Sequence, residues 1–334
     1  MTQSENKLNI LSTLLKLSIS VGLIYWTYQR GLWNFSYLAH YGKEPITLLG
    51  GFFLLMFTLV LISQRWKNVL SQFSLEAKKT QLVVYVKIVW ISCLFNSFLP
   101  GSVAGDLLRF KYKSQLGTDI KTSTTLLTTL IDRVIALMVV LILAGLAPWL
   151  LDFKSFVESK ILAESLELVK LLSLIPLLFY ATLSLPKKIF YMLLKKIPFI
   201  RPSFFDLMVK LHSLRNTVVT NTLITLFCQG IVMGLFLWWG HSLWHNLNQA
   251  ILLISMTALG FVFIAVPISP AGAGVGHVVF ETLYREVGLS QGANLFNLYF
   301  LINFSINLVG IIPFLLTKAD KKLPALKTKD YMAD

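Results

Sequence analysis

The sequence is poor in charged residues. Only 14% of its 334 residues are charged, whereas 55% are hydrophobic and the mean hydropathy is +0.69. Soluble domains carry about 25% charged residues, so this composition leaves no room for a separate soluble domain. Several apolar runs reach the roughly 18–20 residues that a membrane-spanning helix needs. The composition therefore predicts one all-α, polytopic membrane domain covering residues 1–334.

Cysteine and metal-ligand patterns are also scarce. The two cysteines, Cys93 and Cys228, lie in apolar runs, and no C-x-x-C pair exists. His241 and His245 have the spacing of metal ligands but no third ligand near them. No strand precedes the glycine-rich run at 272–276 and no lysine follows it, which excludes a nucleotide-binding loop. We therefore expect no metal and no cofactor.

Acidic residues are few relative to basic ones, with 16 Asp and Glu against 30 Lys and Arg. The basic residues stand in short connections between apolar runs, where they report membrane topology and can meet anionic lipid head groups. A nucleic-acid-binding protein needs an exposed basic face instead. We expect membrane lipids as partners and no nucleic acid. A homo-oligomer is compatible with the sequence, which specifies no oligomeric state.

The apolar runs predict eight membrane segments. About six are full spans, at 8–28, 46–63, 124–147, 168–185, 218–239 and 295–316. The first has no small-residue cleavage site and is expected to stay uncleaved. The other two segments, 82–112 and 250–285, are interrupted in the middle.

Proline and glycine cause both interruptions, because proline cannot continue a helix and glycine permits a sharp reversal. The residues expected to break the backbone are Pro100, Gly101, Gly105, Pro267, Pro270, Gly272, Gly274 and Gly276. Broken backbone inside a bilayer is tolerated only where protein or a water-filled cavity satisfies it. Two interrupted segments in matching positions are a typical sign of a transporter's binding site.

The charges of the connections predict the topology. Basic connections at 64–81, 109–121 and 186–216 and the basic tail are placed in the cytoplasm, and the acidic connection at 148–167 outside. Both termini are then cytoplasmic, and the interrupted segments become re-entrant hairpins from opposite faces. The halves, about 1–150 and 151–334, form an inverted-topology repeat. Half-helix N-termini at the hairpin tips would attract an anion such as phosphate.

Four charged residues near the first break are candidates for substrate binding. Asp106 and Arg109 are three residues apart and share a helical face, so they form either a structural salt bridge or a site where arginine holds a phosphate. Asp132 and Arg133 are adjacent and face different directions. They either tie the span at 124–147 to the hairpin or contact substrate directly.

Two further candidates follow the second break. Glu281 is expected to bind a cationic head group or to couple proton movement, and the alternative is a structural role. His277 serves either in packing or as a hydrogen-bond donor to substrate.

The residues around the first break resemble a signature of the lysylphosphatidylglycerol synthase transmembrane region, also called the flippase-like domain family. The pattern N-x-x-x-P-G-x-x-x-G-D-x-x-R corresponds to Asn96, Pro100, Gly101, Gly105, Asp106 and Arg109. Other blocks of that family resemble Arg65-Trp66, Asp132-Arg133 and residues 267–276. The chain departs from the pattern where Pro270-Ala271-Gly272 replaces P-G-G. The usual acidic residue of the next block is also displaced, with His277 near its place and Glu281 four residues on.

The resemblance implies a flippase without the soluble aminoacyl-transferase domain, and therefore no synthase activity. We expect translocation of a phosphate-bearing lipid between leaflets of a bacterial inner membrane. The lipid would be an anionic phospholipid, an aminoacyl-phospholipid or a polyprenyl phosphate, and Asn96 would join the substrate-binding residues. The alternatives are a membrane-embedded glycosyl- or acyl-transferase acting on a lipid carrier, or a small-solute transporter.

Overall fold

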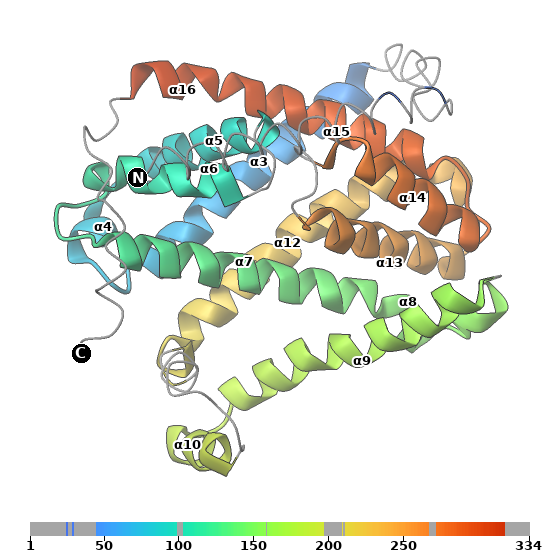
Figure 1. The fold of residues 1–334 in the computed structure, drawn as a ribbon, viewed down its shortest axis with the longest axis horizontal. Helices are drawn as coiled ribbons and strands as arrows, with labels where there is room; N and C mark the ends of the chain where they lie inside the picture. The colour runs from blue at the N-terminus through green and yellow to red at the C-terminus, as the bar shows by residue number, and fades with distance from the viewer. Residues whose placement is uncertain are drawn as a thin grey trace, which may run out of the picture.

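The structure, a computed structural model, describes residues 25, 29, 45–98, 103–157, 159–196, 209, 211–266 and 272–317. These residues form helices and short connections, with no β-strand in this part of the chain (Figure 1). The predicted first span, at 8–28, and the basic tail from 318 lie outside the described residues except for Tyr25. The predicted all-α, polytopic helical bundle is confirmed.

Six helical segments are long and apolar enough to cross a membrane. They are α3 (Pro45–Leu70), α7 (Thr122–Ala144), α9 (Lys160–Leu183), α12 (Arg215–Trp239), α13 (Leu247–Ile264) and the near-continuous pair α15 (Gly292–Val309) and α16 (Ile311–Leu316). The shorter elements between them are α4 (Leu75–Lys79), η1 (Arg109–Gln115), α8 (Leu146–Leu150), η2 (Phe153–Ser155), α10 (Lys187–Lys196) and η3 (His241–Leu243).

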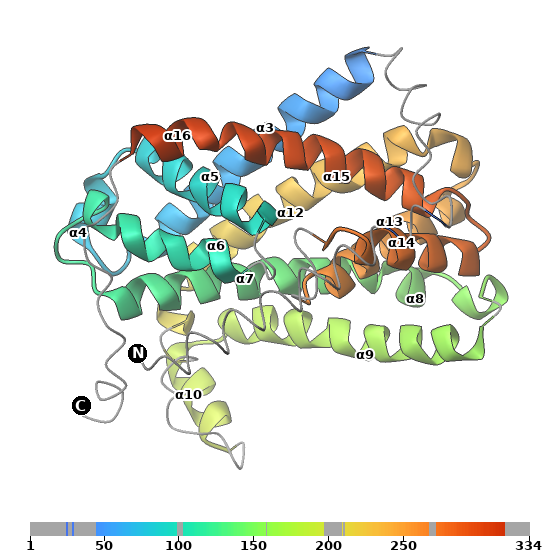
Figure 2. The same cartoon turned by 45° about the horizontal axis from the view of Figure 1, so that its top comes forward.

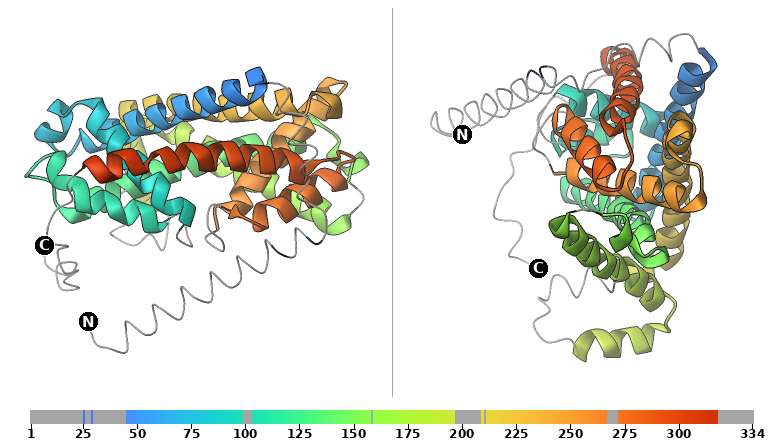
Figure 3. Two further views of the ribbon diagram at one scale, coloured as in Figure 1. Left: turned by 90° about the horizontal axis from the view of Figure 1, so that it is seen from above. Right: turned by 90° about the vertical axis from the view of Figure 1, so that its right-hand side faces the viewer.

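Two helical hairpins enter the bundle from opposite ends of its long axis (Figures 2 and 3). Hairpin one pairs α5 (Leu82–Phe98) with α6 (Val103–Leu108), and hairpin two pairs α13 with α14 (Val275–Glu286). At 1.5 Å per residue, α6 is about 9 Å long and α14 about 18 Å, so neither crosses a hydrocarbon core of about 30 Å. The 18-residue α13 is long enough to count as a span. Re-entrance and the inverted repeat stay predictions.

Several predicted boundaries are wrong. The span expected to end at 63 continues to Leu70, because the charge of Arg65 is neutralised inside the bundle. The span expected to begin at 168 begins at Lys160, where the Ser159 side chain caps the helix by accepting a hydrogen bond from the Leu162 amide. The half-helix expected over 103–112 ends at Leu108 and continues as the 3₁₀ turn η1.

One helix, α15, contacts both hairpins. The Asn307 amide donates to the Ser97 hydroxyl of hairpin one at 2.9 Å. Near its other end, Asn297 Oδ1 lies 3.3 Å from the ring Nε2 of His277 in hairpin two. The two asparagines are ten residues apart, which is about 15 Å along a helix. The described ends of both hairpins therefore contact the same helix, at points about 15 Å apart.

The main hydrophobic core lies where α12, α13, α14 and α15 meet. Phe236, Phe280 and Phe296 are almost fully buried there. Gly260 permits this packing, because a Cβ at that position would lie 2.5 Å from the Phe280 ring. The core holds hairpin two against the long helices.

Candidate functional site

The candidate site centres on two adjacent charges in the middle of α7. Asp132 and Arg133 are the eleventh and twelfth of its 23 residues, so each lies about 16 Å from either end of the helix. Charges at this depth in a membrane are rare and often mark a substrate path. Their side chains contact different neighbours, as expected for adjacent residues of a helix, which face different directions.

Asp132 lies in a buried clamp with Arg65 of α3. Arg65 Nε donates to one carboxylate oxygen of Asp132 at 2.5 Å, and Nη2 donates to the other at 3.0 Å. The remaining guanidinium nitrogen donates to the Thr225 hydroxyl of α12 at 2.8 Å. Asn221 adds a bond from its amide to the Arg65 carbonyl oxygen at 2.9 Å. The clamp ties α3, α7 and α12 together, so the contacts of Asp132 are those of a structural residue.

Arg133 forms the second charge cluster, with Asp106 and Arg109 of hairpin one. Arg133 Nε and Nη2 lie 2.9 and 2.7 Å from the same oxygen of Asp106. Arg109 Nη2 lies 3.3 Å from the other oxygen. The Asp106 and Arg109 side chains are buried, whereas that of Arg133 is 46% exposed. We call these three residues the Asp106 cluster.

Three buried polar atoms in and beside this cluster have no hydrogen-bond partner. They are Asp106 Oδ1, Arg109 Nε and the ring nitrogen of Trp66. The Arg109 guanidinium lies over the Trp66 ring, 4.8 Å from its centroid, which contributes a cation–π attraction. Because buried polar groups normally have partners, the cluster has hydrogen-bonding capacity left for another group.

Asn96 holds α6 in place beneath the cluster. Its side-chain oxygen accepts a hydrogen bond from the Gly105 amide at 2.8 Å. A Cβ on Gly105 would lie 2.1 Å from the Ser92 carbonyl oxygen of α5. Asn96 therefore fixes the backbone next to Asp106 and supports the position of that carboxylate.

The candidates in hairpin two have separate surroundings. Glu281 accepts a hydrogen bond from the Ala293 amide in the first turn of α15 at 3.0 Å and pairs with Arg285 at 3.3 Å. His277 is fully buried and packs edge-on against Phe296. The Ala293 and Phe296 contacts join α14 to α15, the Arg285 pair lies within α14, and none of these contacts reaches the Asp106 cluster.

The residues expected to break the backbone divide into three groups. Gly272 and Gly274 have φ of 77° and 78°, a conformation that favours glycine, between the end of α13 and the start of α14. Gly105 and Gly276 instead lie inside helices, where the missing side chain permits close packing, so they are not breaks. The prolines Pro100, Pro267 and Pro270, with Gly101, lie outside the described residues.

The lysylphosphatidylglycerol synthase TM region family matches residues 13–310 of the 334. The chain belongs to this family. No curated protein and no solved structure matches it. Membership, together with the six apolar helical segments, makes this a multi-pass membrane protein of a family related to lipid modification or flipping.

Three residues of the site are not among the candidates predicted from the sequence. Arg65 and Trp66 match a block of the family but were expected in the connection after the second span, and Thr225 was not considered. A signal for Arg65 was present, because an arginine directly after an apolar run can lie inside the bundle if a carboxylate such as Asp132 is available.

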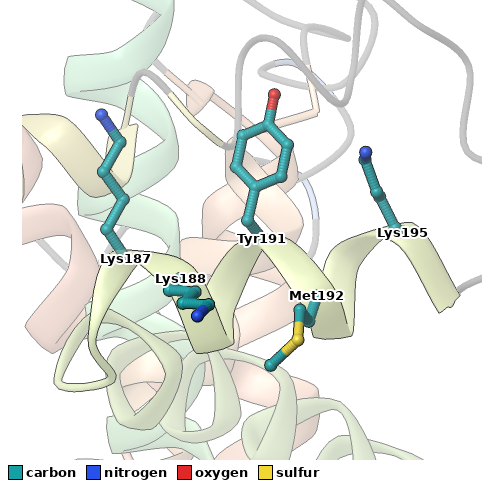
Figure 4. Close-up of a pocket in the computed structure, with 5 residues that line it drawn as sticks. All are labelled: Lys187, Lys188, Tyr191, Met192 and Lys195. Carbon is teal, nitrogen blue, oxygen red and sulfur yellow. The ribbon is translucent and has the colours of Figure 1, made fainter.

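A surface pocket on α10 is separate from the charge clusters. Lys187, Lys188, Tyr191, Met192 and Lys195 line it (Figure 4). Figure 4 shows Lys187, Tyr191 and Lys195 on one side of the helix, and the Lys195 ammonium lies 5.5 Å from the centre of the Tyr191 ring. Phe190 of the same helix is buried, and its ring stacks on that of His212 with 4.4 Å between the ring centres. Among the described residues, no group of three or more His, Cys, Asp or Glu could hold a metal ion.

Proposed function

We propose that the protein moves a phosphate-bearing lipid between membrane leaflets, with the head group bound at the Asp106 cluster and no covalent chemistry. The observation that carries the proposal is the half-exposed Arg133 at the midpoint of α7, paired with a buried carboxylate. We further propose a bacterial plasma membrane with both termini in the cytoplasm.

Arg133 lies at the middle of a helix that is long and apolar enough to cross a membrane. An arginine at the centre of a bilayer costs about 2.5–3.5 kcal/mol even on favourable scales. A half-exposed guanidinium at that depth is stable if it faces water or a polar head group, since the acyl chains offer it no partner. Arginine suits a phosphate because its planar fork binds two oxygens at once.

The pairing within the cluster explains how a head group enters. Arg133 and Arg109 both interact with Asp106, on different oxygens. When a phosphate forms an ion pair with Arg133, Asp106 therefore keeps its ion pair with Arg109. The buried carboxylate is never left without a partner. The head group replaces one ion pair by another, which lowers the barrier to its passage while the acyl chains stay in lipid.

The test is translocation of fluorescent phospholipids in proteoliposomes, measured by quenching the label in the outer leaflet. We expect Arg133→Gln to slow translocation at least about tenfold, and Arg133→Lys to retain part of the rate because it keeps the charge without the fork. Lys160→Gln is the matched control, because it also removes one positive charge, and Lys160 is exposed on α9 and pairs only loosely with Glu164 at 3.9 Å.

Wild-type rates in Arg133→Gln would remove the cluster from the path. Formation of a modified lipid by purified protein and a donor would favour the transferase alternative. Saturable uptake of a soluble substrate into lipid-sealed vesicles would favour the small-solute transporter.

A further inference from the structure

The charges of the site set the charge of the ligand. The Arg65–Asp132 clamp is a neutral pair with both carboxylate oxygens engaged. The Asp106 cluster holds two guanidinium groups and one carboxylate, which leaves one net positive charge. In a surrounding of low dielectric, an uncompensated charge is costly, so the best ligand brings one negative charge.

Among the described residues at this site, a cationic group meets only carboxylates that are already paired with arginine, although Asp106 Oδ1 has no hydrogen-bond partner. Asp106 already interacts with two arginines, and Asp132 is held by Arg65. Glu281, the residue expected to bind a cationic head group, pairs with Arg285 and accepts from the backbone of α15. A lipid whose head group is net positive would therefore be repelled by the cluster.

A ligand with two negative charges is also mismatched, because it leaves one negative charge in the same buried place. The available hydrogen-bonding capacity fits one phosphate group. Arg109 Nε is a buried donor without a partner, and it lies in the same cluster as the half-exposed Arg133.

We infer that the site selects a lipid with a monoanionic phosphodiester head group, such as phosphatidylglycerol, over a net-cationic aminoacylated lipid and over a dianionic phosphomonoester. This inference rests on the proposed function for its location, but it concerns binding and can be tested without translocation.

The experiment measures the affinity of purified protein in neutral detergent for four lipids by native mass spectrometry. The lipids are phosphatidylglycerol, lysyl-phosphatidylglycerol, phosphatidylethanolamine and phosphatidic acid at a pH where it is a dianion. We expect wild type to bind phosphatidylglycerol at least about tenfold more tightly than each of the others, a difference of about 1.4 kcal/mol.

Two variants shift the charge of the cluster in opposite directions. Asp106→Asn raises it by one, and we expect the ratio of phosphatidic acid to phosphatidylglycerol binding to rise about tenfold. Arg133→Gln lowers the charge of the cluster by one. Because Arg133 is half-exposed, this variant still tests the inference if Asp106→Asn does not fold. For this variant we expect phosphatidylethanolamine to bind as well as phosphatidylglycerol. Glu164→Gln makes the same charge change as Asp106→Asn at a distant exposed position.

The outcomes separate the inference from the proposed function. Tightest binding of lysyl-phosphatidylglycerol by wild type, or an unchanged ranking in a folded charge variant, overturns the inference even if lipids are translocated. The expected ranking and shifts support it even if the proteoliposomes show no translocation, in which case the proposed function fails and the site is a lipid-binding site only.

Discussion

Breaking the Arg65–Asp132 clamp from one side is predicted to destabilise the protein strongly, whereas replacing both residues is not. The single change is Asp132→Leu, and the double change adds Arg65→Met. Both side chains are almost fully buried, at 6% exposure for Arg65 and 3% for Asp132. The comparison tests whether Asp132 is structural or binds substrate.

The magnitude follows from the bonds of the clamp. Asp132 accepts two of the three hydrogen bonds of the Arg65 side chain. Its removal leaves a buried charge without a counter-ion, which costs about 3–5 kcal/mol, whereas apolar replacement of a whole buried pair is often neutral or stabilising. Thr225 tolerates the double change, because its hydroxyl also donates to the Asn221 carbonyl oxygen.

The assay is thermal unfolding of purified protein in detergent, followed by tryptophan fluorescence. At about 2 °C per kcal/mol for a large chain, Asp132→Leu lowers Tm by roughly 6–10 °C, and the double variant returns to within a few degrees of wild type. A single-variant loss below about 2 °C would refute the burial argument. Loss of translocation in a stable double variant would instead return Asp132 to the substrate-binding residues.

Two other perturbations follow from the packing and from α10. Gly105→Ala forces a Cβ against the Ser92 carbonyl oxygen and should lower the free energy of unfolding by about 1–3 kcal/mol. Gly230→Ala, where nothing lies within 4 Å of the added Cβ, should be neutral or slightly stabilising. Equal unfolding temperatures for the two variants would contradict the close approach of Gly105 to Ser92. Replacing Lys187, Lys188 and Lys195 by Gln should weaken binding of the detergent-purified protein to vesicles that contain anionic lipid, by about 1 kcal/mol per lysine. Binding to vesicles of neutral lipid should not change. An equal loss on both kinds of vesicle would show that the lysines act on folding.

The helical class and most membrane segments could be predicted because apolar length is a local property. The Asp106–Arg109 pair was among the expected alternatives because its residues lie three apart. The Arg133–Asp106 contact joins residues that are 27 positions apart. From the sequence, Arg133 was therefore expected to contact either the hairpin or the substrate, with no partner residue specified.

The residues that sequence analysis misplaced depend on partners far along the chain. Arg65 reads as the basic end of a span until Asp132, 67 residues later, neutralises it. Asn297 and Asn307 read as ordinary polar residues of a span, because their contacts with the hairpins are set by packing alone. Glu281 was considered for its charge, whereas its bond to the α15 backbone follows from how α14 and α15 pack.

The contacts that α15 makes with both hairpins also limit how the family can vary. Asn297 and Asn307 meet different hairpins from one continuous helix. A single inserted residue between them would turn one contact by about 100° and move it by about 1.5 Å relative to the other. We therefore expect relatives to differ in side chains between these two positions but not in length, so that evolution changes this stretch by substitution and never by insertion or deletion.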